Sequence, residues 1–114
     1  MSYEIQTTKD FERSLKKLSK RYRSLYEDYG KFLDSLQDNP FQGAELYPNI
    51  RKIRMAIASK GKGKAGSARV ITANAIVAEQ QGSIALLTLY DKSDAATVDI
   101  NIVKQMAKEL GFDI

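Results

Sequence analysis

The spacing of apolar side chains changes along the chain, and these changes predict seven elements in the order β-α-α-β-β-β-α. Residues 3–7 alternate between apolar and polar side chains, which is typical of a short strand. A helix is expected from Lys9, because Phe11, Leu15 and Leu18 recur at helical spacing along one narrow stripe.

A second helix is expected from Ser24, and Asp38-Asn39-Pro40 ends it. Its apolar stripe is wide and consists of Leu25, Tyr29, Phe32, Leu33 and Leu36. Two consecutive helices joined by a short connection favour an antiparallel helical hairpin.

The second half of the chain has the pattern of a sheet followed by one helix. Residues 41–49 are turn-like, with Gly43 and Pro48, and Gln81-Gly82 marks a hairpin turn. The expected elements are strands at 50–57, 68–79 and 83–90, a loop at 58–67 and a helix at about 97–110. Strands joined by short connections imply a small antiparallel sheet with the helices on one face, which is an α+β fold.

The 114 residues suffice for one domain, 1–114, and the 43% apolar and 28% charged composition is that of an ordinary globular protein. No stretch has the length and apolarity of a membrane span, and the N-terminus lacks a signal-peptide pattern. We therefore expect a cytoplasmic protein with no membrane partner.

Two residue types are absent, and their absence excludes whole classes of chemistry. There is no Cys, which excludes thiolate nucleophiles and Cys-type metal sites, and no His, which excludes Ser-His-Asp triads and imidazole ligands. We predict neither a metal site nor a cofactor, so catalysis must use Lys, Arg, Tyr, carboxylates or the substrate itself.

The net charge of +4 is unevenly distributed. No acidic residue occurs between Glu45 and Glu79, and this stretch is rich in Lys and Arg. The first helix and its flanks are rich in Lys and Arg as well. The basic residues of the acid-free stretch are Arg51, Lys52, Arg54, Lys60, Lys62, Lys64 and Arg69. Such a density of cations indicates a polyanionic partner, because each neutralised phosphate releases counterions.

One motif in this stretch is deceptive. Residues 61–66 match G-x-G-x-x-G, but the dinucleotide-binding motif precedes a helix, whereas a strand is expected from Ala68. What remains is a basic loop whose glycines allow the backbone to approach a phosphate closely.

The order of four motifs resembles the RelE/ParE superfamily of type II toxin–antitoxin toxins, and most of all its RelE/HigB branch. The motifs occupy 51–54 (RKIR), 59–64 (SKGKGK), 68–72 (ARVIT) and 86–94 (LLTLYDKSD). The resemblance implies a RelE-like fold and a toxin that cleaves mRNA in the ribosomal A site and is neutralised by a cognate antitoxin.

Carried over position by position, the resemblance implies catalytic roles for Lys52, Arg54, Arg69, Tyr90 and Lys92. It implies RNA binding by Lys60, Lys62, Lys64 and Arg51. The chain lacks the His or Glu acid–base pair of some relatives and the late C-terminal tyrosine of others, because it ends Phe112-Asp113-Ile114.

The residues themselves permit metal-independent cleavage of RNA by its own 2′-hydroxyl. Lys52 is the candidate base, since neighbouring positive charges favour some neutral amine. Arg54 and Arg69 can grip the phosphate, while Tyr90 or Lys92 can protonate the leaving oxygen. Two alternatives stay open, a ParE-like inhibitor of DNA gyrase and a non-catalytic basic nucleic-acid-binding domain.

Overall fold

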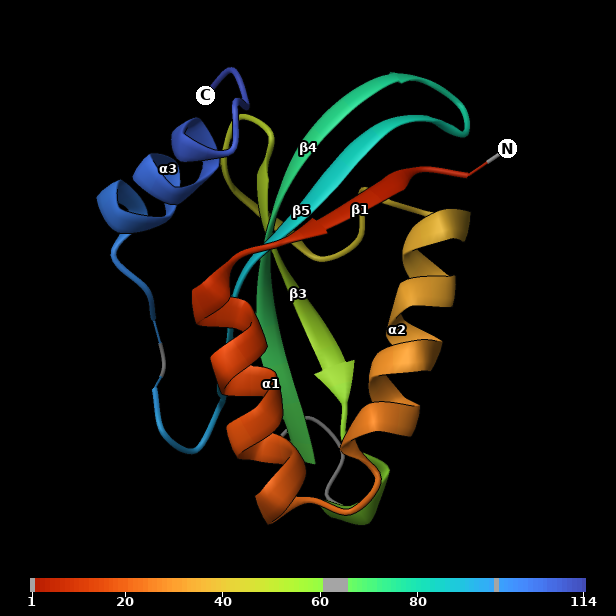
Figure 1. Cartoon of the computed structure of the whole chain (residues 1–114), viewed down its shortest axis with the longest axis vertical. Helices are drawn as coiled ribbons and strands as arrows, with labels where there is room; N and C mark the ends of the chain where they lie inside the picture. Colours follow the sequence, from red (N-terminus) through yellow and green to blue (C-terminus); the bar gives the residue numbers. More distant parts are fainter. Residues whose placement is uncertain (1, 61–65, 96) are drawn as a thin grey trace.

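The computed structural model describes residues 2–60, 66–95 and 97–114 and has the α+β architecture predicted from the sequence (Figure 1). Its helices are α1 (Lys9–Arg21), α2 (Leu25–Asp38) and α3 (Ile100–Glu109), and a short 3-10 turn, η1, covers Ala58–Lys60. Its strands are β1 (Glu4–Thr7), β2 (Ala44–Tyr47), β3 (Ile50–Ala56), β4 (Ser67–Ala78) and β5 (Gln81–Asp91).

The strands form one sheet in the order β1-β5-β4-β3-β2, and this sheet is mixed rather than purely antiparallel. Strands β2 to β5 pair antiparallel, as expected, but β1 pairs parallel with β5, with Glu4 opposite Ser83 and Thr7 opposite Leu86. The expectation of an antiparallel sheet was therefore wrong for its first strand. Local alternation indicates a strand but not its partner, and a parallel pair needs a long crossover, which the rest of the chain supplies here.

Strand β2 was not expected, because its sequence is short and flanked by the turn residues Gly43 and Pro48. It forms the outer edge of the sheet, and all four of its residues are exposed. The β4–β5 turn also lies earlier than predicted. Ala78 pairs with Gln81, and Gln80 takes the left-handed conformation with φ 62°.

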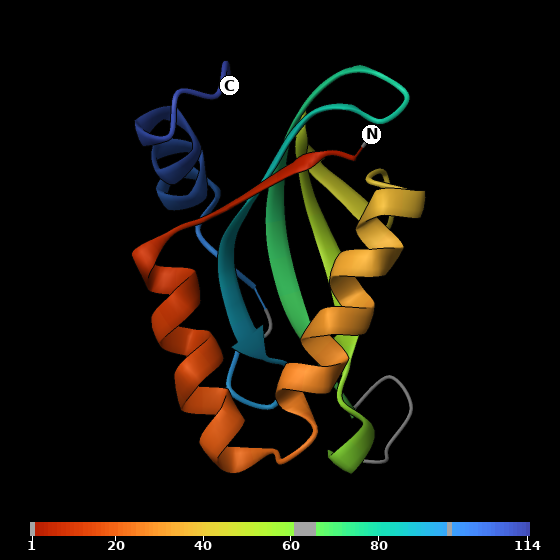
Figure 2. The same cartoon turned by 45° about the vertical axis from the view of Figure 1, so that its right-hand side comes forward.

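The helices cover both faces of the sheet, which corrects the expectation that all of them share one face (Figure 2). Helices α1 and α2 run antiparallel, as predicted, and cover one face with Phe11, Leu15 and Phe32. Helix α3 covers part of the other face with Val103 and Ala107, packed against Ile71 and Leu87 among others. The strand residues therefore divide into two cores, and the part of the second face beyond α3 is left uncovered.

Side-chain caps fix where two of the helices begin. Thr8 Oγ1 accepts a hydrogen bond from Phe11 N at 2.9 Å and donates to Leu87 O at 2.6 Å, which joins α1 to β5. Asp99 accepts from Asn101 N at 2.9 Å, so α3 begins at Ile100 and not at Thr97. In the described part of the chain, no helix has the length and apolar character needed to cross a membrane.

Candidate nucleic-acid interface

Three of the predicted site residues form a row across the sheet. Arg54 on β3 stands directly opposite Arg69 on β4, and Arg69 stands directly opposite Tyr90 on β5. Directly opposed side chains in an antiparallel pair lie on the same face with Cβ atoms about 5 Å apart. We call these three residues the cross-strand row; they lie on the face that α3 covers only in part.

The two arginines of the row differ in exposure but share a lack of acidic partners. Arg54 is exposed, whereas Arg69 is 8% exposed and donates from Nη1 to Ser67 Oγ and, at 3.3 Å, to Ala68 O. Among the described residues, no carboxylate pairs with either guanidinium. Like charges directly opposite one another destabilise a sheet, so this pair is expected to take up an anion.

Lys52 is two residues before Arg54 on β3, so its side chain lies on the same face as the row. It stands opposite Ile71 on β4. Together with Arg54 and Arg69 it lines an open hollow of about 610 Å³. The other lining residues come from β3 and from the edge of the sheet: Gln42, Gly43, Ala44, Leu46 and Ile53. The structure thus brings Lys52, Arg54 and Arg69 together as predicted, and their roles in a reaction stay predictions.

Gly43 shapes the rim of this hollow. Its φ of 75° lies in the left-handed region, and a Cβ built there would lie 2.1 Å from the Lys52 carbonyl oxygen. Only glycine allows the segment before β2 to pass so close to β3. The hollow therefore depends on a residue that carries no functional group.

Tyr90 ends the row, but its side chain is largely covered. The ring packs against the second core, as do Val98, Ile100 and Met106 of the C-terminal segment. Its hydroxyl is buried and has no hydrogen-bond partner among the described residues. Lys92, the last of the predicted catalytic residues, is exposed in the turn that follows β5.

Of the predicted RNA-binding residues that the structure describes, Arg51 and Lys60, neither lines the hollow. Arg51 donates from Nε to Gln42 O at 2.8 Å and from Nη2 to Gly43 O at 3.1 Å, and it lies 3.8 Å from Glu45. Lys60 pairs with Asp91, as described next. Lys62 and Lys64 lie outside the described residues.

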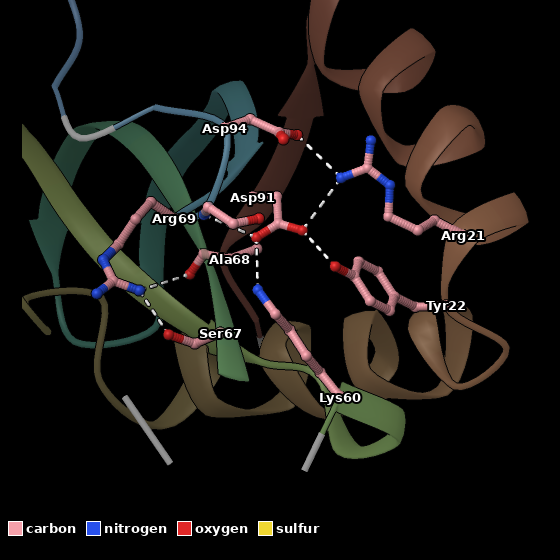
Figure 3. Close-up of polar contacts among 9 residues, drawn as sticks. Arg21, Tyr22, Lys60, Ser67, Ala68, Arg69, Asp91 and Asp94 are labelled. Carbon is pink, nitrogen blue, oxygen red and sulfur yellow. Dashed lines mark hydrogen bonds and ion pairs between the residues drawn. The ribbon is translucent and has the colours of Figure 1, made fainter. Parts of the chain in front are cut away.

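Asp91 is the centre of a second polar site that sequence reasoning missed. Its carboxylate is 1% exposed, and it accepts from Lys60 Nζ at 2.7 Å, from Tyr22 OH at 2.5 Å and from Arg21 Nη1 at 3.2 Å. We call these four residues the Asp91 cluster. Figure 3 shows the Asp91 carboxylate pointing toward its three partners, while Arg69 extends away from them toward Ser67.

The cluster strongly favours the charged form of Asp91. Burial alone would raise the pKa of this carboxyl, but hydrogen bonds from Lys60, Tyr22 and Ser93 outweigh burial and hold the pKa well below its usual range. The hydrogen bond between Lys60 and Asp91 also raises the pKa of Lys60. The signal in the sequence was weak, because the partners lie 31 and 69 positions from Asp91.

Comparison with known proteins supports the fold. No protein-family model matches the chain. A solved structure of the E. coli toxin RelE, a mutant with two arginines replaced by alanine and in the free state, aligns with a TM-score of 0.54 at 15% sequence identity. The alignment covers 98% of this chain and 100% of that one. The chain therefore has a RelE-like fold, as the sequence resemblance implied.

Proposed function

We propose that this chain is the toxin of a toxin–antitoxin system and that it cleaves mRNA on the ribosome. The observation that carries the proposal is the opposed pair Arg54 and Arg69, which has no carboxylate partner among the described residues and lines a hollow together with Lys52. The likeness of the fold to the toxin RelE supports the same conclusion.

A phosphodiester of single-stranded RNA matches the chemistry of this hollow. Guanidinium groups offer parallel N–H donors that fit two phosphoryl oxygens, and they stay charged at any physiological pH. Arg54 is exposed and free to move onto a ligand, while buried Arg69 is held by Ser67 and Ala68. One arginine therefore approaches the phosphate, and the other is already oriented for it.

Cleavage then requires no nucleophile from the protein. The ribose 2′-oxygen attacks the adjacent phosphorus and loses its proton to a base, for which Lys52 Nζ is the candidate. The bond from phosphorus to the 5′-oxygen breaks, leaving a 2′,3′-cyclic phosphate and a 5′-hydroxyl. The proton for that hydroxyl comes from Lys92 or from water, because the Tyr90 hydroxyl is buried. The arginines stabilise the charge that builds on the phosphoryl oxygens.

The proposal includes two partners. The first is mRNA in the ribosomal A site, where the ribosome orients the strand and supplies much of the positioning. The second is a cognate antitoxin with an acidic or amphipathic segment that fits a basic sheet face and becomes ordered on binding. Both partners place the protein in the cytoplasm.

The test is translation-dependent cleavage in a reconstituted translation system, with cut sites mapped by primer extension. We expect the wild type to cut mRNA and the double variant Arg54→Ala, Arg69→Ala to cut at least about 100-fold more slowly, since charge stabilisation by each group is worth several kcal/mol. A matched control, Arg13→Ala with Arg23→Ala, removes two exposed arginines from elsewhere and is expected to cut normally.

Other outcomes contradict the proposal in different ways. Uncut transcripts together with a DNA-damage response would indicate a gyrase inhibitor. Salt-sensitive binding to nucleic acid with no cleavage and no growth arrest would indicate a basic binding domain. Normal cleavage by the double arginine variant would show that the hollow is not the active site.

A further inference from the structure

The Asp91 cluster lies directly behind the cross-strand row. Tyr90 and Asp91 are consecutive residues of β5, so their side chains point to opposite faces of the sheet. Tyr90 stands opposite Arg69, and Asp91 stands opposite Ala68. The buried Asp91 carboxylate therefore lies on the opposite face of the sheet from Tyr90 and Arg69, at the same ends of β4 and β5.

The cluster joins three segments that are far apart in the sequence. Arg21 and Tyr22 come from the end of α1, Lys60 ends η1, and Asp91 ends β5. The turn after β5 is tied to the same carboxylate, because Ser93 N donates to Asp91 Oδ1 at 3.0 Å. Lys60 and Arg21 also lie over the Tyr22 ring, at 5.7 Å and 5.9 Å from its centroid.

The cluster leaves little freedom to the groups that it holds. The Lys60 side chain is only 17% exposed, and its hydrogen bond with the charge of Asp91 is short. Hydrogen bonds between ionised groups are about twice as strong as neutral ones, and removal of one partner leaves a buried charge uncompensated. This network therefore fixes the ends of β5 and η1 relative to each other.

We propose that Asp91 is a positioning residue for the cleavage reaction: by binding Lys60, Tyr22 and Arg21 behind the sheet, it holds Tyr90 in place opposite Arg69 and fixes the turn that carries Lys92. The inference rests on the proposed function. It also assigns Lys60 to this anchor rather than to contact with RNA, in contrast to the expectation from the sequence.

The first experiment compares Asp91→Asn with Asp94→Asn in single-turnover and steady-state cleavage. Asp94 pairs with the same Arg21 at 3.0 Å, but its side chain is 54% exposed, so the matched control removes one carboxylate without opening the cluster. We expect Asp91→Asn to lower kcat about tenfold or more with KM changed less than about threefold, because misplaced groups cost turnover. We expect Asp94→Asn to change either constant less than about twofold.

A stability control separates positioning from loss of folded protein. Leu15→Ala removes buried side-chain volume on α1, away from the row, and is expected to lower the melting temperature at least as much as Asp91→Asn does. If Leu15→Ala slows cleavage as much as Asp91→Asn at equal concentrations of folded protein, Asp91 has only a structural role. Asp91→Glu, which keeps the charge, is expected to recover part of kcat.

The second experiment tests whether Asp91 acts through Lys60. We expect Lys60→Met to lower kcat in the wild type and to change it less than about twofold in the Asp91→Asn background, since residues of one network are not additive. An equal rise of KM in both backgrounds would instead identify Lys60 as an RNA contact and overturn the assignment.

A third measurement does not depend on cleavage at all. In NMR spectra, Asp91→Asn is expected to shift the Tyr90 ring and Arg69 side-chain resonances, and Asp94→Asn is not. If the wild type fails to cut mRNA, the proposed function fails while this measurement still tests the anchor. Unchanged Tyr90 and Arg69 resonances would overturn the positioning inference even in an active enzyme.

Discussion

Arg54 and Arg69 stand directly opposite each other on neighbouring antiparallel strands, and no carboxylate among the described residues neutralises either of them. Two like charges in this relationship weaken a sheet. The chain keeps an arrangement that costs stability, which is what a site for an anionic ligand requires.

Replacing Arg54 by Thr is expected to stabilise the protein and abolish cleavage. The change removes the repulsion and introduces a side chain that favours strands, so the free energy of unfolding should rise by about 0.5 kcal/mol at low salt. Urea denaturation at two salt concentrations measures the free energy of unfolding, and the increase over the wild type should be smaller at high salt. Arg51→Thr on the same strand is the control, and it should lose about 1 kcal/mol because its guanidinium binds Gln42 O and Gly43 O. A loss of stability in Arg54→Thr would contradict the repulsion argument.

RNA binding should weaken with salt in proportion to the phosphates contacted. For a single-stranded RNA, log K falls with log salt by about 0.7 per phosphate, so Arg54→Ala should flatten the slope by about 0.7. Fluorescence anisotropy with a non-cleavable oligonucleotide, 2′-deoxy at the cut position, gives the slope. Arg13→Ala on α1 should leave it unchanged. Equal slopes for Arg54→Ala and wild type would remove Arg54 from the interface.

Alanine substitutions at Gly43 and Gly30 should change the free energy of unfolding in opposite directions. Gly43→Ala forces a side chain into the left-handed region and against the Lys52 carbonyl, so it should cost about 2 kcal/mol and distort the hollow. Gly30→Ala lies within α2, where a Cβ would meet nothing within 4 Å, and it should add about 0.5–1 kcal/mol. Thermal melts and cleavage assays check both. A Gly43→Ala variant with normal stability and activity would show that the rim is not tightly packed.

The Asp91 cluster should make the fold sensitive to acid. The pKa of Asp91 is lowered in the folded protein relative to the unfolded value near 3.8. Its contribution to stability is therefore complete above about pH 5 and is lost as the pH falls through the unfolded value toward the lower folded one. At pH 7 we expect Asp91→Asn to be less stable than the wild type by about 2 kcal/mol. In urea titrations at pH 7, 4 and 3, the difference in stability between the wild type and Asp91→Asn should narrow as the pH falls. A difference that stays constant would show that the charge of Asp91 is not its cause.

The sequence allowed most of the elements to be predicted, because alternation in 50–57 and helical spacing in α1 and α2 are local signals. It did not predict the partner of β1, since the hydrogen bonds from Glu4–Thr7 reach residues 83–86 and no local pattern encodes such a pairing. It placed α3 on the wrong face for a related reason. The face that α3 covers is set by the packing of Val103 and Ala107 against the second core, and composition does not encode that choice.

The candidate site was predicted in part. Alternation put Lys52 and Arg54 on one face, and the structure adds Arg69 to them through the β3–β4 register. That register depends on the hairpin and could not be derived from either strand alone. The prediction of Lys60 as an RNA-binding residue of the basic loop missed Asp91, because an ion pair between residues so distant in sequence becomes visible only in the folded chain.

The parallel pairing of β1 with β5 has a consequence for the order in which the protein is made. Strand β1 has no hydrogen-bonding neighbour until residues 83–86 are added, and the same strand, β5, supplies Tyr90. A nascent chain that carries both arginines but ends before residue 81 lacks β5, the strand that lies between β1 and β4 and pairs with both. The cross-strand row is therefore complete only after β5 has been synthesised and has paired with β4.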